Sequence, residues 1–144
     1  MQGNAKKVIT LLFFILLLLS QAAAQGKKTP KPIAPYSAFV WAGNTLYLAG
    51  QIPIDPNTGK LIRDDIQKAT RQVMDNIGAI LKQNELNFNN LVKCTIYLKD
   101  MNNYSEVNKV YAEYFPGKFP ARVAVEVARL PLDADIEISS IAVK

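Results

Sequence analysis

Residues 119–131 read FPARVAVEVARLP, a stretch between two prolines in which small and branched apolar residues alternate. Alternation with a period of two predicts a β-strand, because successive side chains of a strand point to opposite faces of the sheet. Val123 and Val125 would then point to one face. Arg122 and Ala124 would point to the other, where the small alanine leaves open space. Arg122 is therefore predicted either to be solvated or to line a pocket.

Four further strands and two helices are expected around this stretch, from β-branched and aromatic runs, helical spacing of apolar residues, and intervening turn residues. The order is ββαβαββ, with strands at 37–41, 45–51, 91–98, 119–131 and 136–143 and helices that begin at Asp64 or Asp65 and at Asn102 or Asn103. This order predicts a single α+β domain with both helices on one face of one sheet. The other face would need cover, which an oligomer could supply.

The beginning of the chain has the features of a secretory signal peptide. Lys6 and Lys7 precede the apolar run VITLLFFILLLL at 8–19, and Ala22-Ala23-Ala24 supplies the small residues that a signal peptidase recognises. The apolar run is shorter than the ~20 residues of a membrane-spanning helix. We therefore expect cleavage before Gln25, export to a periplasm or to the extracellular medium, and no stable membrane anchor afterwards.

These features divide the chain into three parts. Residues 1–24 are predicted to be the signal peptide. Residues 25–35, QGKKTPKPIAP, are predicted to be a flexible leader because lysine and proline dominate them. Residues 36–144 are predicted to be one folded domain, a length that fits a single hydrophobic core.

Composition excludes several kinds of chemistry. The chain has no histidine, which excludes histidine-dependent triads, cysteine–histidine dyads and the usual zinc sites. Cys94 is the single cysteine, so no internal disulfide forms, and its place in an apolar strand predicts core packing. Lysine and arginine number 17 against 12 acidic residues, a net charge of +5, and they are scattered along the chain. No compact basic block is present, so we expect no nucleic-acid partner.

Several segments of the chain resemble those of one known family. They are APYS at 34–37, LAGQIP at 48–53, VNKVY at 107–111, PARVAVEVARLP at 120–131 and IEI at 136–138. Together, and in this order, they resemble the reactive-intermediate deaminase family, also called Rid or YjgF. Members of that family are enamine and imine deaminases.

The resemblance implies a chorismate-mutase-like sheet and assembly as a homotrimer with active sites in the clefts between subunits. The implied reaction is hydrolysis of 2-imino acids, such as 2-iminopropanoate and 2-iminobutanoate, to 2-keto acids and ammonium. Such imino acids form from enamines, for example 2-aminoacrylate. An imine carbon is already electrophilic, so neither a metal ion nor an organic cofactor is expected.

The matched motifs also imply roles for individual residues. Arg122 would bind the substrate carboxylate, for which its planar pair of donors is suited. Glu137 would position or activate water. Tyr36, Gly50 and Asn108 would line the cleft. Without the resemblance, these last three would be a half-buried aromatic, a bulge glycine and a polar residue at a helix edge.

Two positions depart from the family pattern, because Ala49 and Ala124 replace a small hydroxyl residue and a cysteine that many members carry. If the last two strands form a hairpin with Ala124 opposite Glu137, Arg122 lies one diagonal step away on the same face. Ala124 would then form the floor of a substrate-binding pocket between Arg122 and Glu137. The alternative is an ordinary cross-strand ion pair, worth ~0–1 kcal/mol.

Two other functions compete with imine hydrolysis. Ala49 and the signal peptide favour an exported, non-catalytic protein that binds small carboxylic acids in the same clefts. RNA binding or cleavage, attributed to some relatives of the family, is disfavoured by the dispersed charge and by export.

Overall fold

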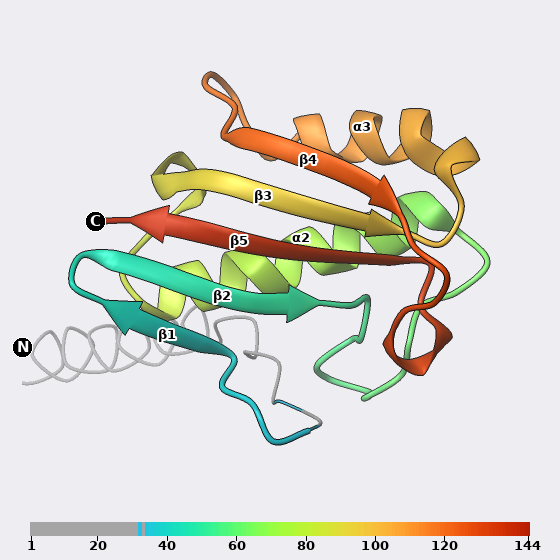
Figure 1. The fold of residues 1–144 in the computed structure, drawn as a ribbon, viewed down its shortest axis with the longest axis horizontal. Helices are drawn as coiled ribbons and strands as arrows, with labels where there is room; N and C mark the ends of the chain where they lie inside the picture. The colour runs from blue at the N-terminus through green and yellow to red at the C-terminus, as the bar shows by residue number, and fades with distance from the viewer. Residues whose placement is uncertain (1–31, 33) are drawn as a thin grey trace, which may run out of the picture.

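The fold is that of a computed structural model, which describes residue 32 and residues 34–144. One five-stranded sheet has two helices, α2 (Ile66–Gln83) and α3 (Tyr104–Ala112), on one face (Figure 1). The strands are β1 (Phe39–Ala42), β2 (Thr45–Gln51), β3 (Leu91–Leu98), β4 (Ala121–Glu126) and β5 (Ile136–Val143). The predicted ββαβαββ order and α+β class are confirmed. The predicted signal peptide and most of the leader lie outside the described residues.

The strands follow the order β1-β2-β5-β3-β4 across the sheet, so β3 separates β4 from β5. The predicted hairpin between the last two strands, with Ala124 opposite Glu137, is therefore wrong. Ala124 pairs with Ile96 of β3, and Glu137 pairs with Tyr97 across the other edge of that strand. The physical reason is that β5 pairs with β2 on one edge and with β3 on the other, which leaves no edge for β4. Before β4, the helix α3 forms a crossover that returns the chain to the end of the sheet where β3 began. A strand reached in this way pairs in parallel with the strand before it, as β4 does with β3.

The hydrophobic core lies between the sheet and α2. Asp65 caps the start of α2, because its side chain accepts a hydrogen bond of 3.0 Å from the backbone N–H of Lys68. Apolar residues at helical spacing then face the strands, and the fully buried side chains include Leu46, Val73, Ile77, Ile80, Ile96 and Ile138. Within the described residues, no helix is both long and apolar enough to cross a membrane.

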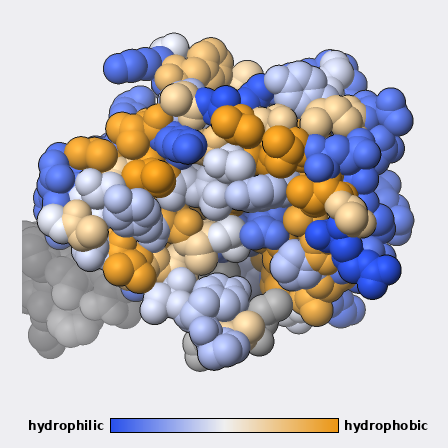
Figure 2. Space-filling view, in the orientation of Figure 1, coloured by the Kyte–Doolittle hydropathy of each residue, from blue (hydrophilic) through white to orange (hydrophobic). Residues whose placement is uncertain are grey.

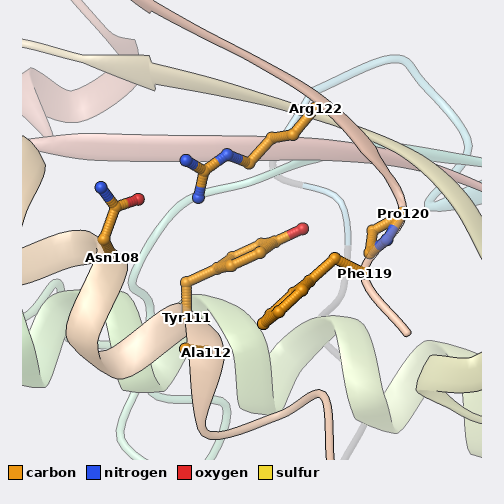
Figure 3. A pocket seen from close by; sticks show the side chains of 6 residues that line it. All are labelled: Asn108, Tyr111, Ala112, Phe119, Pro120 and Arg122. Carbon is orange, nitrogen blue, oxygen red and sulfur yellow. The ribbon is translucent and has the colours of Figure 1, made fainter. Parts of the chain in front are cut away.

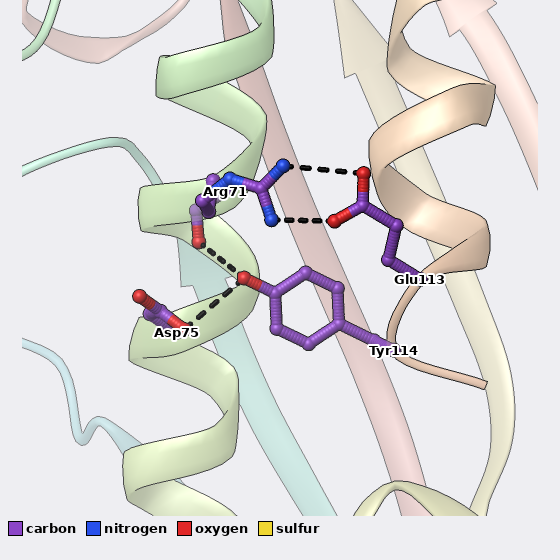
Figure 4. Close-up of polar contacts among 4 residues, drawn as sticks. All are labelled: Arg71, Asp75, Glu113 and Tyr114. Carbon is purple, nitrogen blue, oxygen red and sulfur yellow. Dashed lines mark hydrogen bonds and ion pairs between the residues drawn. The ribbon is translucent and has the colours of Figure 1, made fainter. Parts of the chain in front are cut away.

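Polar contacts fix the end of α3 against α2 (Figure 4). Arg71 of α2 donates two hydrogen bonds to the Glu113 carboxylate, at 2.6 and 3.2 Å. The Tyr114 hydroxyl lies 3.1 Å from Asp75 Oδ1 and 3.2 Å from the Arg71 carbonyl oxygen. Burial, together with the charge of Asp75, raises the pKa of Tyr114 well above its ordinary value, so this hydroxyl stays protonated. These contacts hold α3 in place, and α3 carries Asn108.

The face of the sheet away from the helices exposes apolar side chains. Val40, Tyr47, Val123 and Val125 are 37% to 55% exposed. Figure 2 views this face and shows groups of apolar residues among polar ones over the strands. Exposed apolar groups on one face are typical of surfaces that another protein covers. Cover by other copies of the chain therefore stays a prediction with physical support.

Candidate active site

The structure places the predicted site residues in two groups on opposite faces of the sheet. Arg122 pairs with the buried Cys94, so its side chain lies on the helix-covered face. Glu137 lies between the buried Ile136 and Ile138, so its side chain points to the open face. The predicted convergence of Arg122 and Glu137 within one chain is therefore wrong. It assumes a β4–β5 hairpin, but β3 separates these two strands in the sheet.

Arg122 lines a cavity of about 340 Å³ on the helix-covered side, between α3 and the start of β4 (Figure 3). The lining residues are Asn108, Tyr111, Ala112, Phe119, Pro120 and Arg122. Aromatic rings and small apolar side chains form most of the wall, and Arg122 supplies its positive charge. Of the two predicted states of Arg122, solvated or lining a pocket, the structure shows the second.

Two tyrosines hold the Arg122 guanidinium in place. Its carbon lies 4.9 Å from the centre of the Tyr111 ring and 5.5 Å from that of Tyr104. Arg122 Nη2 also donates a hydrogen bond of 2.9 Å to the Tyr104 hydroxyl. Cation–π contacts contribute ~0.5–1 kcal/mol at exposed sites and more where water is excluded. No carboxylate among the described residues forms an ion pair with Arg122, so its other donors are free to bind an anion.

Asn108 and Tyr111 place polar atoms beside the guanidinium. Asn108 Oδ1 is buried and has no hydrogen-bond partner among the described residues. A hydrogen-bond donor on a ligand would satisfy it. Burial, followed by the neighbouring Cys94 thiol, raises the pKa of Tyr111 well above its ordinary value, so the phenol stays neutral. Cys94 itself is buried, with its Sγ 3.5 Å from Ser140 Oγ, which confirms the predicted core packing.

Glu137 lies in a second cleft, of about 290 Å³, at the end of β2. This Glu137 cleft is lined by Ala34, Tyr36, Ala49, Gly50, Ile52, Pro131 and Glu137. The structure thus brings Tyr36 and Gly50 together with Glu137, whereas Asn108 belongs to the Arg122 cavity. Ala49 contributes a methyl group to the cleft and offers no hydroxyl for a hydrogen bond.

The Glu137 side chain crosses directly over Gly50. The pairing of β2 with β5 shifts register between Leu48 and Gln51, and this bulge contains Gly50. A β-carbon at position 50 would overlap Glu137 Oε1 and would lie 2.7 Å from Cδ, so only glycine permits this position of the carboxyl group. Burial raises the pKa of Glu137 above its ordinary value. A general base gains efficiency as its pKa rises toward the working pH, so the direction of this shift suits a proton acceptor.

Sequence reasoning missed Tyr104 and misplaced Ala124. Tyr104 lies four residues before Asn108 and seven before Tyr111, and this spacing puts all three on one face of a helix. That spacing was the available signal. Ala124 packs against the core and is not among the residues that line either cavity.

Comparisons with known proteins show which family the chain belongs to. A sequence model of the family described as Endoribonuclease L-PSP matches residues 26–144. A RutC family protein of Pyrococcus horikoshii is 56% identical over 118 residues, which cover 82% of this chain and 94% of that protein. The 2-iminobutanoate/2-iminopropanoate deaminase of Mus musculus is 43% identical over 117 residues, which cover 81% of this chain and 87% of the relative.

One solved structure with a similar fold is that of TdcF from E. coli with bound serine. It has a TM-score of 0.78 and 35% sequence identity to this chain, and the match covers 82% of this chain and 94% of that one. The family model and these relatives align with nearly the whole predicted domain. The chain therefore belongs to the Rid (YjgF) family, whose sequence model is described as Endoribonuclease L-PSP.

Proposed function

We propose that the protein is a hydrolytic deaminase that converts 2-imino acids, including 2-iminopropanoate and 2-iminobutanoate, to 2-keto acids and ammonium. The observation that carries this proposal is Arg122, a guanidinium with no carboxylate partner among the described residues, in the wall of a largely apolar cavity. Such a site suits a small molecule with one carboxylate and an otherwise uncharged body. The deaminase name of relatives at about 43% identity supports the same reaction, although more similar relatives carry only a family name.

A complete site of this kind needs two chains. Within one chain, the Arg122 cavity and the Glu137 cleft open on opposite faces of the sheet. In the proposed homotrimer, the Arg122 cavity of one subunit faces the Glu137 cleft of its neighbour. The exposed apolar side chains of the open face, Val123 and Val125 among them, support such an assembly because contact with another subunit would remove them from water.

In this site Arg122 binds the carboxylate, and the carbon of the C=NH₂⁺ group faces Glu137 of the neighbouring subunit. As water attacks that carbon, Glu137 accepts one of its protons, a C–O bond forms, and C=N becomes a single bond. Glu137 then returns the proton to the nitrogen of this carbinolamine. The C–N bond breaks, ammonia leaves with the electron pair, and the proton of the new hydroxyl passes through Glu137 to ammonia. One water is consumed, and the products are the 2-keto acid and ammonium.

An assay with an imino acid made in situ tests this function. An amino-acid oxidase releases 2-iminopropanoate from alanine, and its decay is followed with and without the protein. We expect faster decay, with sedimentation of the same sample giving the mass of a trimer. Decay at the uncatalysed rate in the presence of a folded trimer would exclude the proposed reaction.

Binding without turnover is the second candidate function, and two observations favour it. Ala49 removes a hydroxyl from the Glu137 cleft, and a relative with the same fold holds the amino acid serine. In that case, calorimetry would detect binding of small carboxylic acids, whereas the imino acid would decay at the uncatalysed rate. The family description names a ribonuclease, but the dispersed basic residues of this chain lead us to expect no RNA retention.

Export of the protein belongs to the same proposal. The signal peptide predicted for residues 1–24 lies outside the described residues, and the family model begins at residue 26. N-terminal sequencing of protein recovered from the periplasm or the medium tests this point. A first residue of Gln25 would support cleavage, and retention of the whole chain in the cytosol would contradict it.

A further inference from the structure

The loop Leu130–Ala134, called here the Pro131 loop, has an unfavourable backbone beside the Glu137 cleft. Its Pro131 lines the cleft, and the next two residues, Leu132 and Asp133, have φ angles of 54° and 59°. Residues with a β-carbon rarely adopt this left-handed region, and leucine does so less readily than aspartate or asparagine. Two such residues in succession persist only where the surrounding structure holds them.

Arg63 and Lys99 make the contacts that hold the Pro131 loop. Arg63 Nη2 donates a hydrogen bond of 2.7 Å to the Leu132 carbonyl oxygen, and Arg63 Nη1 lies 3.9 Å from Asp133 Oδ2. Lys99 Nζ lies 3.0 Å from the other oxygen of the same carboxylate. Lys99 and then Arg63 lower the pKa of Asp133, so this carboxylate is charged at neutral pH and both contacts are present.

The backbone around Arg63 is tied to a second part of the cleft wall. That wall is formed by the end of β2, where Gly50 and Ile52 line the cleft. The chain then loops out and returns, and the Ile62 N–H donates a hydrogen bond of 2.8 Å to the Pro53 carbonyl oxygen. Arg63 follows directly, two residues before the Asp65 cap of α2. The Arg63 side chain thus connects the Ile52 wall to the Pro131 wall.

We propose that Arg63 is a positioning residue that sets the separation of the two walls of the Glu137 cleft and thereby the place of Glu137 relative to substrate. This inference rests on the proposed imine hydrolysis. The side chain of Arg63 is 49% exposed and that of Asp133 53%, so their ion pair contributes little to global stability. Its effect is geometric. It acts on water delivery by Glu137, whereas the substrate carboxylate binds at Arg122, on the other face of the sheet.

Arg63→Gln in the full-length chain tests this role. We expect kcat to fall about tenfold, because small displacements of catalytic groups have large effects on rate. KM should stay within about twofold, since Arg122 is untouched. Amide hydrogen exchange of residues 130–135 should accelerate at the same time. Lys144→Gln is the matched control, because Lys144 also lies 3.9 Å from a carboxylate, that of Glu85, and does not line the cleft.

A second variant separates positioning from a general loss of structure. Asparagine adopts the left-handed region more readily than leucine, so Leu132→Asn added to Arg63→Gln should restore at least half of the lost kcat and slow the exchange again. Arg63→Lys keeps the charge but not the forked donors, and should fall between wild type and Arg63→Gln.

If Arg63→Gln had the same kcat and the same amide hydrogen exchange as the wild type, the inference would be overturned. A change confined to KM would overturn it as well. If the wild-type protein hydrolyses no imino acid, the proposed function fails. Exchange of residues 130–135 then decides alone whether Arg63 holds the loop.

Discussion

The Glu137 carboxyl group occupies the volume that a β-carbon at position 50 would fill, with Cδ and Cγ 2.7 and 3.0 Å from that point. Gly50→Ala therefore forces the carboxyl group to move. The far end of a glutamate side chain can rotate away, so we expect a folded protein with at least about tenfold lower kcat in the imine assay. Gly117→Ala is the control, since a β-carbon there meets nothing within 4 Å. Equal turnover of both variants would argue against Glu137 as the proton acceptor.

Arg122→Lys tests the carboxylate site. Lysine keeps the charge but loses the forked pair of donors and the stacking on Tyr111. A hydrogen bond to a charged group contributes ~1.5–3 kcal/mol, so kcat/KM should fall about tenfold to a hundredfold, with KM raised. Tyr104→Phe removes the 2.9 Å hydrogen bond from Arg122 to the Tyr104 hydroxyl and should lower kcat/KM only a few-fold. An unchanged KM in Arg122→Lys would place the substrate carboxylate elsewhere.

Mixing two variants of low activity tests whether each site draws on two subunits. Arg122→Lys and Glu137→Gln chains are unfolded together, refolded as a mixture, and assayed. If Arg122 comes from one subunit and Glu137 from its neighbour, random assembly of equal amounts regenerates about one quarter of the intact sites. The two variants refolded separately and then combined give the baseline. A mixture no more active than that baseline would contradict a site shared between Arg122 of one subunit and Glu137 of another.

The raised pKa of Glu137 predicts opposite effects of pH on activity and on stability. As a proton acceptor it must be ionised, so kcat/KM should fall as the pH drops through its pKa, which lies above the ordinary 4.5. For stability, a raised pKa means that the folded protein holds the proton more tightly than the unfolded chain. The resulting stabilisation is complete below pH 4.5 and is lost as the pH rises through the folded pKa.

Glu137→Gln checks the stability half of that prediction. Its free energy of unfolding in urea should match or exceed that of wild type at pH 7, because a neutral amide avoids the burial of a charge. The advantage should disappear at pH 4, where the wild-type carboxyl group is protonated. A variant less stable than wild type at pH 7 would show that the carboxylate has a favourable partner in the folded protein.

The elements of this fold were predictable from the sequence, but their arrangement in the sheet was not. Period-two alternation identified the strand around Arg122, and helical spacing with an aspartate cap identified α2. These are local signals, which depend on neighbours along the chain. The position of β5 between β2 and β3 depends on pairing between strands that are far apart in the sequence, and no local pattern encodes it.

The same limit explains what was missed at the site. Motifs assigned Arg122 and Glu137 to one function, and alternation alone gives each a face relative to its own strand. Which face of one strand matches which face of the other follows from pairing through β3, with Cys94 opposite Arg122 and Tyr97 opposite Glu137. The separation of the two side chains is therefore a property of the strand order, which neither strand's own residues encode.

The placement of the guanidinium and the carboxyl group on opposite sides of the sheet has a consequence for newly made chains. Under the proposed function, a single chain has no activity, because its Arg122 cavity and its Glu137 cleft are each only half of an active site. Catalysis would begin only when the local concentration allows association. If the proposed export also takes place, a chain in transit across a membrane could not act on metabolites of the compartment it leaves. Serial dilution of the purified protein would reveal this, as specific activity would drop before any loss of secondary structure.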